Sequence, residues 1–159
     1  MMILKSITKN NGRKMKNILF ILIFINTVLF ASTQIDYRTA KIYKDDISSK
    51  KAFDMQQDGA LLIDVRTKPE FNELRAKNSI NIPVFYAKNG KRVFNRNFVN
   101  EIYETSKKNI NKTIILICRS GSRTKLASNL LAEQGFSNIY NVQYGFTYDW
   151  LKVKLPTEK

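Results

Sequence analysis

The chain has 159 residues, of which 43% are hydrophobic and 25% charged, and its 27 Lys+Arg against 13 Asp+Glu give a formal net charge of +14. The length predicts one domain with an appendage, and the apolar fraction excludes a disordered chain. The absence of histidine and the single cysteine exclude a Ser-His or Cys-His catalytic pair, an internal disulfide, a CxxC redox pair and a His or Cys metal site. Thiol chemistry therefore depends on Cys118 alone, and we expect neither metal nor cofactor.

Residues 1–31 have the layout of a secretory signal peptide. Five basic residues and no acid lie within residues 1–17, and an apolar run of 14 residues then ends at Ala31. That run is shorter than the roughly 20 residues that span a membrane. We therefore expect cleavage after Ala31 or Ser32 and export of the domain, most simply to the periplasm. The alternatives are an uncleaved N-terminal anchor and a start at Met15.

The expected organisation is a signal or anchor segment at 1–31, an N-terminal segment at 32–44, a folded domain at 45–153 and a C-terminal tail at 154–159. Lysines occur throughout the chain without an arginine-rich helix or an aromatic RNA-binding motif. We therefore expect a solvated basic surface and no nucleic-acid partner. Membrane contact is expected only through the N-terminal segment, if it stays uncleaved.

Strands and helices are predicted to alternate along the domain. Continuous apolar runs predict strands buried on both faces at 60–65, 113–118 and 138–142, with a short strand at 80–82 and a fifth near Tyr37–Ile42. Helical patterns lie between them at 48–57, at 68–74, around Phe98–Tyr103, and along the stripe from Leu126 to Leu131 that ends before Gly135. This order predicts an α/β fold with a mostly parallel sheet and helices on both faces. The polar, basic segment 85–97 is expected to be a surface loop.

Cys118 ends a predicted buried strand and opens a polar loop that leads into the fourth helix. In parallel sheets, ligands bind beyond the carboxyl ends of the strands, and inward-pointing amides together with a helix N-terminus favour an anion there. The same field favours a thiolate at Cys118, and a persulfide formed on it would also be anionic. The residues expected to hold a bound anion are Arg119, Ser120, Gly121, Ser122, Arg123 and Thr124, of which Ser122 or Thr124 can also cap the helix. A lone cysteine at a strand end is more often a small buried hydrophobe, but two flanking arginines favour function.

The loop CRSGSRT (118–124) resembles the active-site loop of single-domain rhodaneses, sulfurtransferases that carry sulfur as a cysteine persulfide. The resemblance covers about residues 45–150 and implies a rhodanese-like, five-stranded, mostly parallel sheet with Cys118 at the base of a shallow pocket. The segment LLIDVRTKPEF (61–71) is similar to the family's signature strand and turn. Asp64 and the Arg66/Glu70 pair occupy the positions that, by this resemblance, brace the active site without reacting.

Two segments depart from the family pattern. Leu74-Arg75-Ala76 stands where rhodaneses usually read Gly-His-Ile, and Asn78-Ser79 replaces the following Gly-Ala, whereas Asn81-Ile82-Pro83 is intact. In the C-terminal motif GFSNIYNVQYGFTYDW (135–150), Tyr144 replaces the first glycine of a pair. We expect these changes to affect the loops and the choice of partner, Arg75 included, more than the catalytic loop.

The resemblance implies transfer of a sulfane sulfur from an anionic donor such as thiosulfate to a thiol or cyanide acceptor, through a persulfide on Cys118. The alternatives are a non-catalytic rhodanese-like module that binds an envelope protein through residues 74–79, and an exported protein whose thiol forms a mixed disulfide. A Cys-loop phosphatase is a weaker alternative. Phosphatase loops place five residues between Cys and Arg, whereas Cys118 and Arg123 enclose four.

Overall fold

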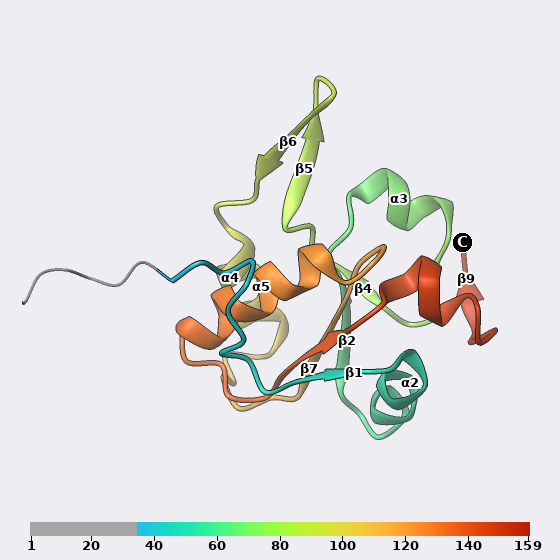
Figure 1. Cartoon of the computed structure of the whole chain (residues 1–159), viewed down its shortest axis with the longest axis horizontal. Coiled ribbons are helices and arrows are strands. Elements are labelled where there is room, and N and C mark those ends of the chain that lie inside the picture. The colour runs from blue at the N-terminus through green and yellow to red at the C-terminus, as the bar shows by residue number, and fades with distance from the viewer. Residues whose placement is uncertain (1–34) are drawn as a thin grey trace, which may run out of the picture. The chain divides into compact units, whose positions relative to one another are not determined.

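The computed structural model describes residues 35–159, and the expected signal segment 1–31 lies outside them. Residues 36–159 fold around a five-stranded sheet in which every neighbouring pair is parallel (Figure 1). This confirms the predicted α/β class. The strand order is β1-β8-β7-β2-β4, with β1 at Asp45–Ile47, β2 at Leu61–Asp64, β4 at Ile80–Asn81, β7 at Ile114–Ile117 and β8 at Ile139–Val142.

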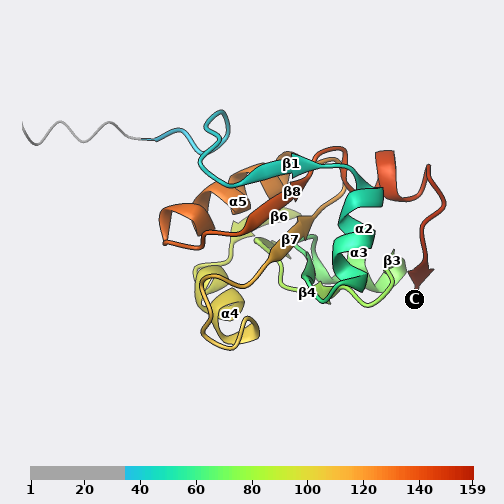
Figure 2. The same cartoon turned by 90° about the horizontal axis from the view of Figure 1, so that it is seen from below.

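Helices cover both faces of the sheet, as Figures 1 and 2 show from two directions. Alternation along β7 explains this: Ile114, Leu116 and Cys118 pack in one apolar cluster, and Ile115 and Ile117 pack in another. The first cluster includes side chains of α4 (Phe98–Thr105) and α5 (Ser122–Glu133), and the second includes side chains of α2 (Ser49–Gln57) and η1 (Phe146–Trp150). Cys118 therefore lies on the face that α4 and α5 cover.

The helix ends follow from local sequence. Ser48 caps α2 by accepting a hydrogen bond from the Lys51 amide at 3.3 Å. The short helix α3 (Lys68–Glu73) has Pro69 in its first turn, where its missing N–H costs no hydrogen bond. Helix α5 starts differently from expectation. Its N-cap is Gly121, and neither Ser122 nor Thr124 supplies a capping side chain.

The fifth strand was expected in the wrong place. It is β1, whereas residues 37–42 contain a turn and no strand. The backbone of this segment bonds instead to one side chain of α5. The Asn129 amide donates to the carbonyls of Tyr37 and Ala40, and its oxygen accepts from the Ile42 amide. Asn129 is fully buried and therefore holds the N-terminal segment against α5.

Residues 85–97, expected to be a loop, contain a β-hairpin. Strands β5 (Phe85–Lys88) and β6 (Lys91–Phe94) pair antiparallel around Asn89-Gly90, which have φ angles of 50° and 71°. Positive φ at both central residues is the geometry that tight hairpin turns require, and Asn-Gly is the sequence best suited to it. The hairpin projects away from the rest of the domain in Figure 1.

The C-terminal end also forms a strand. β9 (Thr157–Glu158) pairs antiparallel with β3 (Arg75–Ala76), so the end of the chain lies against the segment that departs from the rhodanese pattern. The Trp150 indole N–H donates to the Pro156 carbonyl at 3.0 Å and holds the intervening turn. Among residues 35–159, no helix combines the length and the apolar character needed to cross a membrane.

Candidate active site

The candidate site forms where the central strand of the sheet ends. Cys118 directly follows β7, and α5 begins four residues later at Ser122. The intervening turn is therefore at the carboxyl edge of a parallel sheet, the position at which α/β folds bind ligands. The Cys118 side chain is fully buried, whereas Arg119, Ser120 and Ser122 are exposed.

Two groups contact the sulfur. The Gly121 amide donates to Cys118 Sγ at 3.2 Å, and Thr124 Oγ1 lies 3.5 Å from the same atom. The Thr124 hydroxyl also lies 2.7 Å from the Gly121 carbonyl, to which it donates. A hydroxyl has one proton, so a protonated Cys118 donates to Thr124, and a thiolate would compete with the carbonyl for the Thr124 proton. The site can therefore hold sulfur in either form and offers one fixed amide to the anion.

The turn is closed by the segment that follows β8. Phe146 and Thr147 donate their amides to the carbonyls of Cys118 and Arg119 at 2.7 and 3.0 Å. Glycine is needed on both sides of this contact. A Cβ on Gly121 would overlap the Gln143 carbonyl, and a Cβ on Gly145 would overlap the backbone of residues 118–120. Gly145 is the glycine that remains of the pair expected in the C-terminal motif, and this close contact is the reason that a glycine is needed there.

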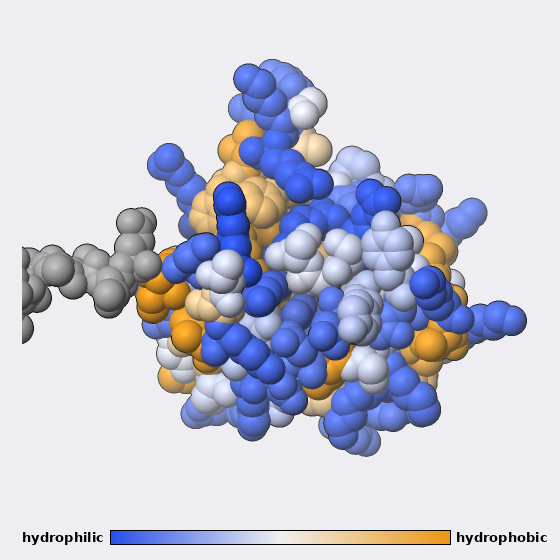
Figure 3. All heavy atoms as spheres, in the orientation of Figure 1, coloured by the Kyte–Doolittle hydropathy of each residue, from blue (hydrophilic) through white to orange (hydrophobic). Residues whose placement is uncertain are grey.

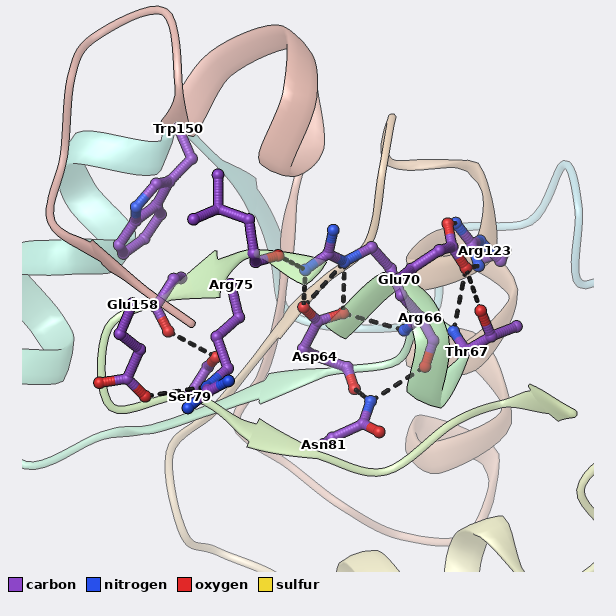
Figure 4. A network of polar contacts seen from close by, with 12 residues as sticks. Asp64, Arg66, Thr67, Glu70, Arg75, Ser79, Asn81, Arg123, Trp150 and Glu158 are labelled. Carbon is purple, nitrogen blue, oxygen red and sulfur yellow. Dashed lines mark hydrogen bonds and ion pairs between the residues drawn. The ribbon is translucent and has the colours of Figure 1, made fainter. Parts of the chain in front are cut away.

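Arg123 is bound to an acid from another element. Its Nη1 and Nη2 each donate to a Glu70 carboxylate oxygen at 2.8 Å, which ties α5 to α3 (Figure 4). Glu70 also accepts from the Thr67 amide and hydroxyl at the start of α3. The Arg123 guanidinium, aided by Thr67, lowers the pKa of Glu70 to about 2. Arg123 is 8% exposed, so the arginine of this turn that faces solvent is Arg119.

Asp64 and Arg66 form a second, deeper pair. Arg66 donates through Nε and Nη2 to the fully buried Asp64 carboxylate, and Nη2 also reaches the Leu74 carbonyl at 2.8 Å. Burial raises the pKa of Asp64, and the Arg66 guanidinium opposes that effect. The pairing differs from the implied Arg66/Glu70 pair, because each of the two residues has a nearer partner. Sequence reasoning missed Asn81, whose side-chain amide holds the carbonyls of Asp64 and Arg66.

Arg75 is engaged by the end of the chain. Its Nε donates to the Glu158 carboxylate at 2.9 Å, its Nη2 donates to the Lys159 carbonyl at 3.0 Å, and its guanidinium lies 4.8 Å from the centre of the Phe71 ring (Figure 4). The residue that replaces the family's usual histidine therefore fastens β9 to β3. Residues 75–76 are therefore already paired with the end of the chain, through both the Arg75 side chain and the β3–β9 backbone pairing.

The Cys118 side chain has no exposed area, so the thiol does not form the open base of a pocket in this structure. A cavity of about 340 Å³ instead adjoins the turn through Ser122 and Arg123. A second, of about 370 Å³, lies at the opposite edge of the sheet among residues such as Asp58 and Asn111. Among the described residues, no cluster of Cys, Asp and Glu is suited to hold a metal ion.

Residues 48–151 match the family model of the rhodanese-like domain. The chain belongs to the rhodanese-like domain family. It is 34% identical over 108 residues to an uncharacterized protein of Rickettsia conorii, covering 64% of this chain and 82% of that protein. It is 33% identical over 92 residues to a mitochondrial protein of Schizosaccharomyces pombe, provisionally named a thiosulfate sulfurtransferase, covering 58% and 61% of the two chains. The crystal structure of a protein from M. tuberculosis superposes with a TM-score of 0.60 at 26% identity, covering 73% of this chain and 98% of that one.

In this rhodanese-like domain, the structure brings together most of the residues expected at the site. Cys118, Gly121 and Thr124 meet at the sulfur, while Arg123 and Glu70 join one turn to the next. Asp64 and Arg66 form a separate buried pair, and the Arg66 guanidinium lies 4.3 Å from the ring centre of Phe146 in η1. Direct contact of a donor with Arg119, Ser120 or Ser122 stays a prediction.

Proposed function

We propose that the protein is a sulfurtransferase that carries a sulfane sulfur on Cys118. The observation that carries this proposal is the Gly121 amide aimed at Cys118 Sγ from 3.2 Å, at the N-terminus of α5. An amide and a helix N-terminus stabilise negative charge, and both the thiolate and its persulfide are anions. Membership of the rhodanese-like family supports the same chemistry.

The proposed reaction proceeds by double displacement. The Cys118 thiolate attacks the outer sulfur of thiosulfate, the sulfur–sulfur bond of the donor breaks, and sulfite leaves with its electron pair. An acceptor thiolate or cyanide then attacks the outer sulfur of the persulfide, which returns the electron pair to Cys118 Sγ. The exposed Arg119 is placed to attract the donor anion, and Arg123, fixed by Glu70, supplies positive charge behind the turn.

We further propose that the domain is exported and acts in the periplasm. The proposal is supported by the basic stretch, the short apolar run and the small residues that end at Ala31–Thr33. An oxidising compartment suits a protein with one cysteine, because no second thiol of the chain can close on it as a disulfide.

A non-catalytic binding module is the second candidate, and the complete burial of Cys118 favours it. The 74–79 segment is a weaker docking surface than expected for that role, because β9 already pairs with β3. The phosphatase alternative requires Arg123 to bind phosphate, whereas both terminal nitrogens of this residue donate to Glu70.

Intact mass after thiosulfate treatment tests the proposal, with Cys118→Ser as the control variant. We expect the wild type alone to gain one sulfur, about 32 Da, and to lose it on addition of cyanide. No gain, with a thiol that iodoacetamide still alkylates, would refute the sulfurtransferase and leave the binding module. The rate of alkylation also reports how readily the enclosed thiol becomes accessible.

A further inference from the structure

The β5–β6 hairpin projects from the described domain, and all of its charged residues are cations. Residues 85–97 contain no acid and four cations, Lys88, Lys91, Arg92 and Arg96. Three apolar or aromatic side chains of the hairpin are also well exposed: Tyr86 and Val93 by 45% and Phe94 by 41%. Figure 3 shows hydrophilic side chains at the tip and apolar side chains at the base.

The two faces of the hairpin have different surroundings. Opposite residues of an antiparallel pair share a face, so Phe85, Phe94 and Arg92 lie on one face, and Tyr86 and Val93 lie on the other. The Tyr86 hydroxyl lies 3.5 Å from the carboxylate of Glu101 in α4. Lys88 and Lys91 share the face of Tyr86 and Val93. Because Tyr86 and Val93 are 45% exposed and Phe94 is 41% exposed, both faces of the hairpin are open to a partner, and Phe85 anchors its base to the core.

The hairpin face that carries Phe85 and Phe94 adjoins the turn from Cys118 to Thr124. Phe85, whose ring centre lies 5.9 Å from that of Phe94, lines the 340 Å³ cavity together with Ser122 and Arg123. The other lining residues are Arg38, Lys125 and Leu126. The cavity therefore combines the apolar side chains of Phe85 and Leu126 with the cations Arg38 and Lys125. It joins the base of the hairpin to the start of α5, which begins beside the buried sulfur.

We propose that this surface docks an acidic protein that presents a cysteine thiolate as the sulfur acceptor. The inference rests on the proposed function, because it names the acceptor of the same persulfide. A small acceptor gains little from an arm outside the site, whereas a protein can use it to bring its thiolate to an enclosed sulfur. On arrival the thiolate attacks the outer sulfur, the Cys118 persulfide bond breaks, and the electron pair returns to Sγ.

The distribution of side chains favours a protein over a membrane or a nucleic acid. A membrane-inserting hairpin carries its apolar residues at the tip, whereas this tip is Lys88-Asn-Gly-Lys91 and the aromatic residues lie at the base. A nucleic acid would need a cationic track with free aromatic faces for stacking. Here the Phe94 ring meets the Phe85 ring edge-on, and Glu101 places an acid beside Tyr86.

Sulfur transfer to two cysteine peptides of equal length tests the proposal. One peptide surrounds the cysteine with Asp, Glu and Leu, and the other with Lys, Arg and Leu. We expect persulfide-loaded protein to transfer sulfur about 10-fold faster to the acidic peptide at low salt, with the advantage lost at high salt. Charge reversal of the tip by Lys88→Glu, Lys91→Glu and Arg92→Glu should abolish or invert that ratio. A matched triple variant on the side of α2, β3 and η1 should preserve it: Lys51→Glu, Lys77→Glu and Lys152→Glu.

A binding measurement separates this inference from the proposed chemistry. Anisotropy of a labelled acidic peptide with serine in place of cysteine reports docking without sulfur transfer. Binding that the tip reversal weakens, in a protein that forms no persulfide, would refute the sulfurtransferase but retain the docking surface. Equal transfer to both peptides by a loaded wild type would refute the docking surface. The proposed acidic partner would also be refuted if phosphatidylglycerol vesicles or an RNA oligonucleotide bound the wild type more tightly than the acidic peptide does, and if the tip variant no longer bound them.

Discussion

Replacement of Gly121 by alanine tests whether the close approach of two backbones holds the Cys118–Thr124 turn in place. Gly121 has φ +91°, and an added Cβ would overlap the Gln143 carbonyl. A side chain in left-handed backbone geometry costs about 1–2 kcal/mol, and overpacking against a fixed backbone adds about 1–3 kcal/mol. Displacement of the turn also weakens the Gly121 amide contact to Cys118 Sγ, which contributes about 1 kcal/mol. We therefore expect a loss of about 3–6 kcal/mol in the free energy of unfolding.

Two other glycines provide a matched control. Gly59 and Gly135 have φ angles of +92° and +90°, and an added Cβ would meet no atom within 4 Å at either position. Gly59→Ala and Gly135→Ala therefore carry the cost of the backbone conformation without the overlap. We expect each of these two variants to lose only about 1–2 kcal/mol in the free energy of unfolding.

Urea unfolding followed by tryptophan fluorescence measures these free energies, with Trp150 as the single reporter. Intact mass after thiosulfate treatment then shows whether any folded Gly121→Ala still loads sulfur. We expect little or no loading, because the amide that faces the sulfur moves with the turn. If Gly121→Ala were no less stable than the two controls and loaded sulfur normally, the proposed role of the close approach would be refuted.

The remaining predictions concern the ion pairs around the site. Glu70→Gln should lower the unfolding free energy by about 2 kcal/mol in urea titrations, because it leaves the nearly buried Arg123 without its anion, whereas the exposed Glu73→Gln should change it little. Because the pKa of Glu70 is depressed from 4.5 to about 2, its stabilising contribution is complete above pH 4.5 and falls as the pH drops toward 2. Between pH 6 and 3, the free energy of unfolding of the wild type should therefore fall by about 1 kcal/mol more than that of Glu70→Gln. This figure allows for solvent screening of a carboxylate that is one-third exposed. Equal losses in the two proteins would contradict this assignment. Arg75→Ala should release β9, measured as faster amide hydrogen exchange at Thr157 and Glu158, and unchanged protection would show that Arg75 does not hold the strand.

The sequence predicts the interior of this fold better than its surface. The four residues of β7 are all buried, so an unbroken apolar run was sufficient to locate the strand. The hairpin gave no such signal, because polar residues occupy both of its faces, and only Asn89-Gly90 marked the turn. The position of β1 was missed for a related reason: its residues are Asp45-Asp-Ile47, while the more apolar segment before it is held by Asn129.

Within the site, contacts between neighbours in sequence were more predictable than contacts between distant residues. The turn from Cys118 to Thr124 is local, so its residue types already indicated an anion site. The partner of Arg123 is 53 residues away, and that of Arg75 is 83 residues away. Such pairs depend on how α3 and the chain end pack, which no local pattern encodes. The close contact between the turn and the segment after β8 likewise depends on Gly145, which comes from a different part of the chain.

The short outer strands of the sheet bear on how copies of this chain behave when crowded together. A long bare strand edge invites pairing with another molecule, but here the edges are β1 and β4, with three and two residues. In the described part of the chain, β5 and β6 are longer, with four residues each, and they pair only with one another. Lysine and arginine side chains guard those exposed edges against aggregation. The positive charge that we propose attracts an acidic partner therefore also keeps identical hairpins apart.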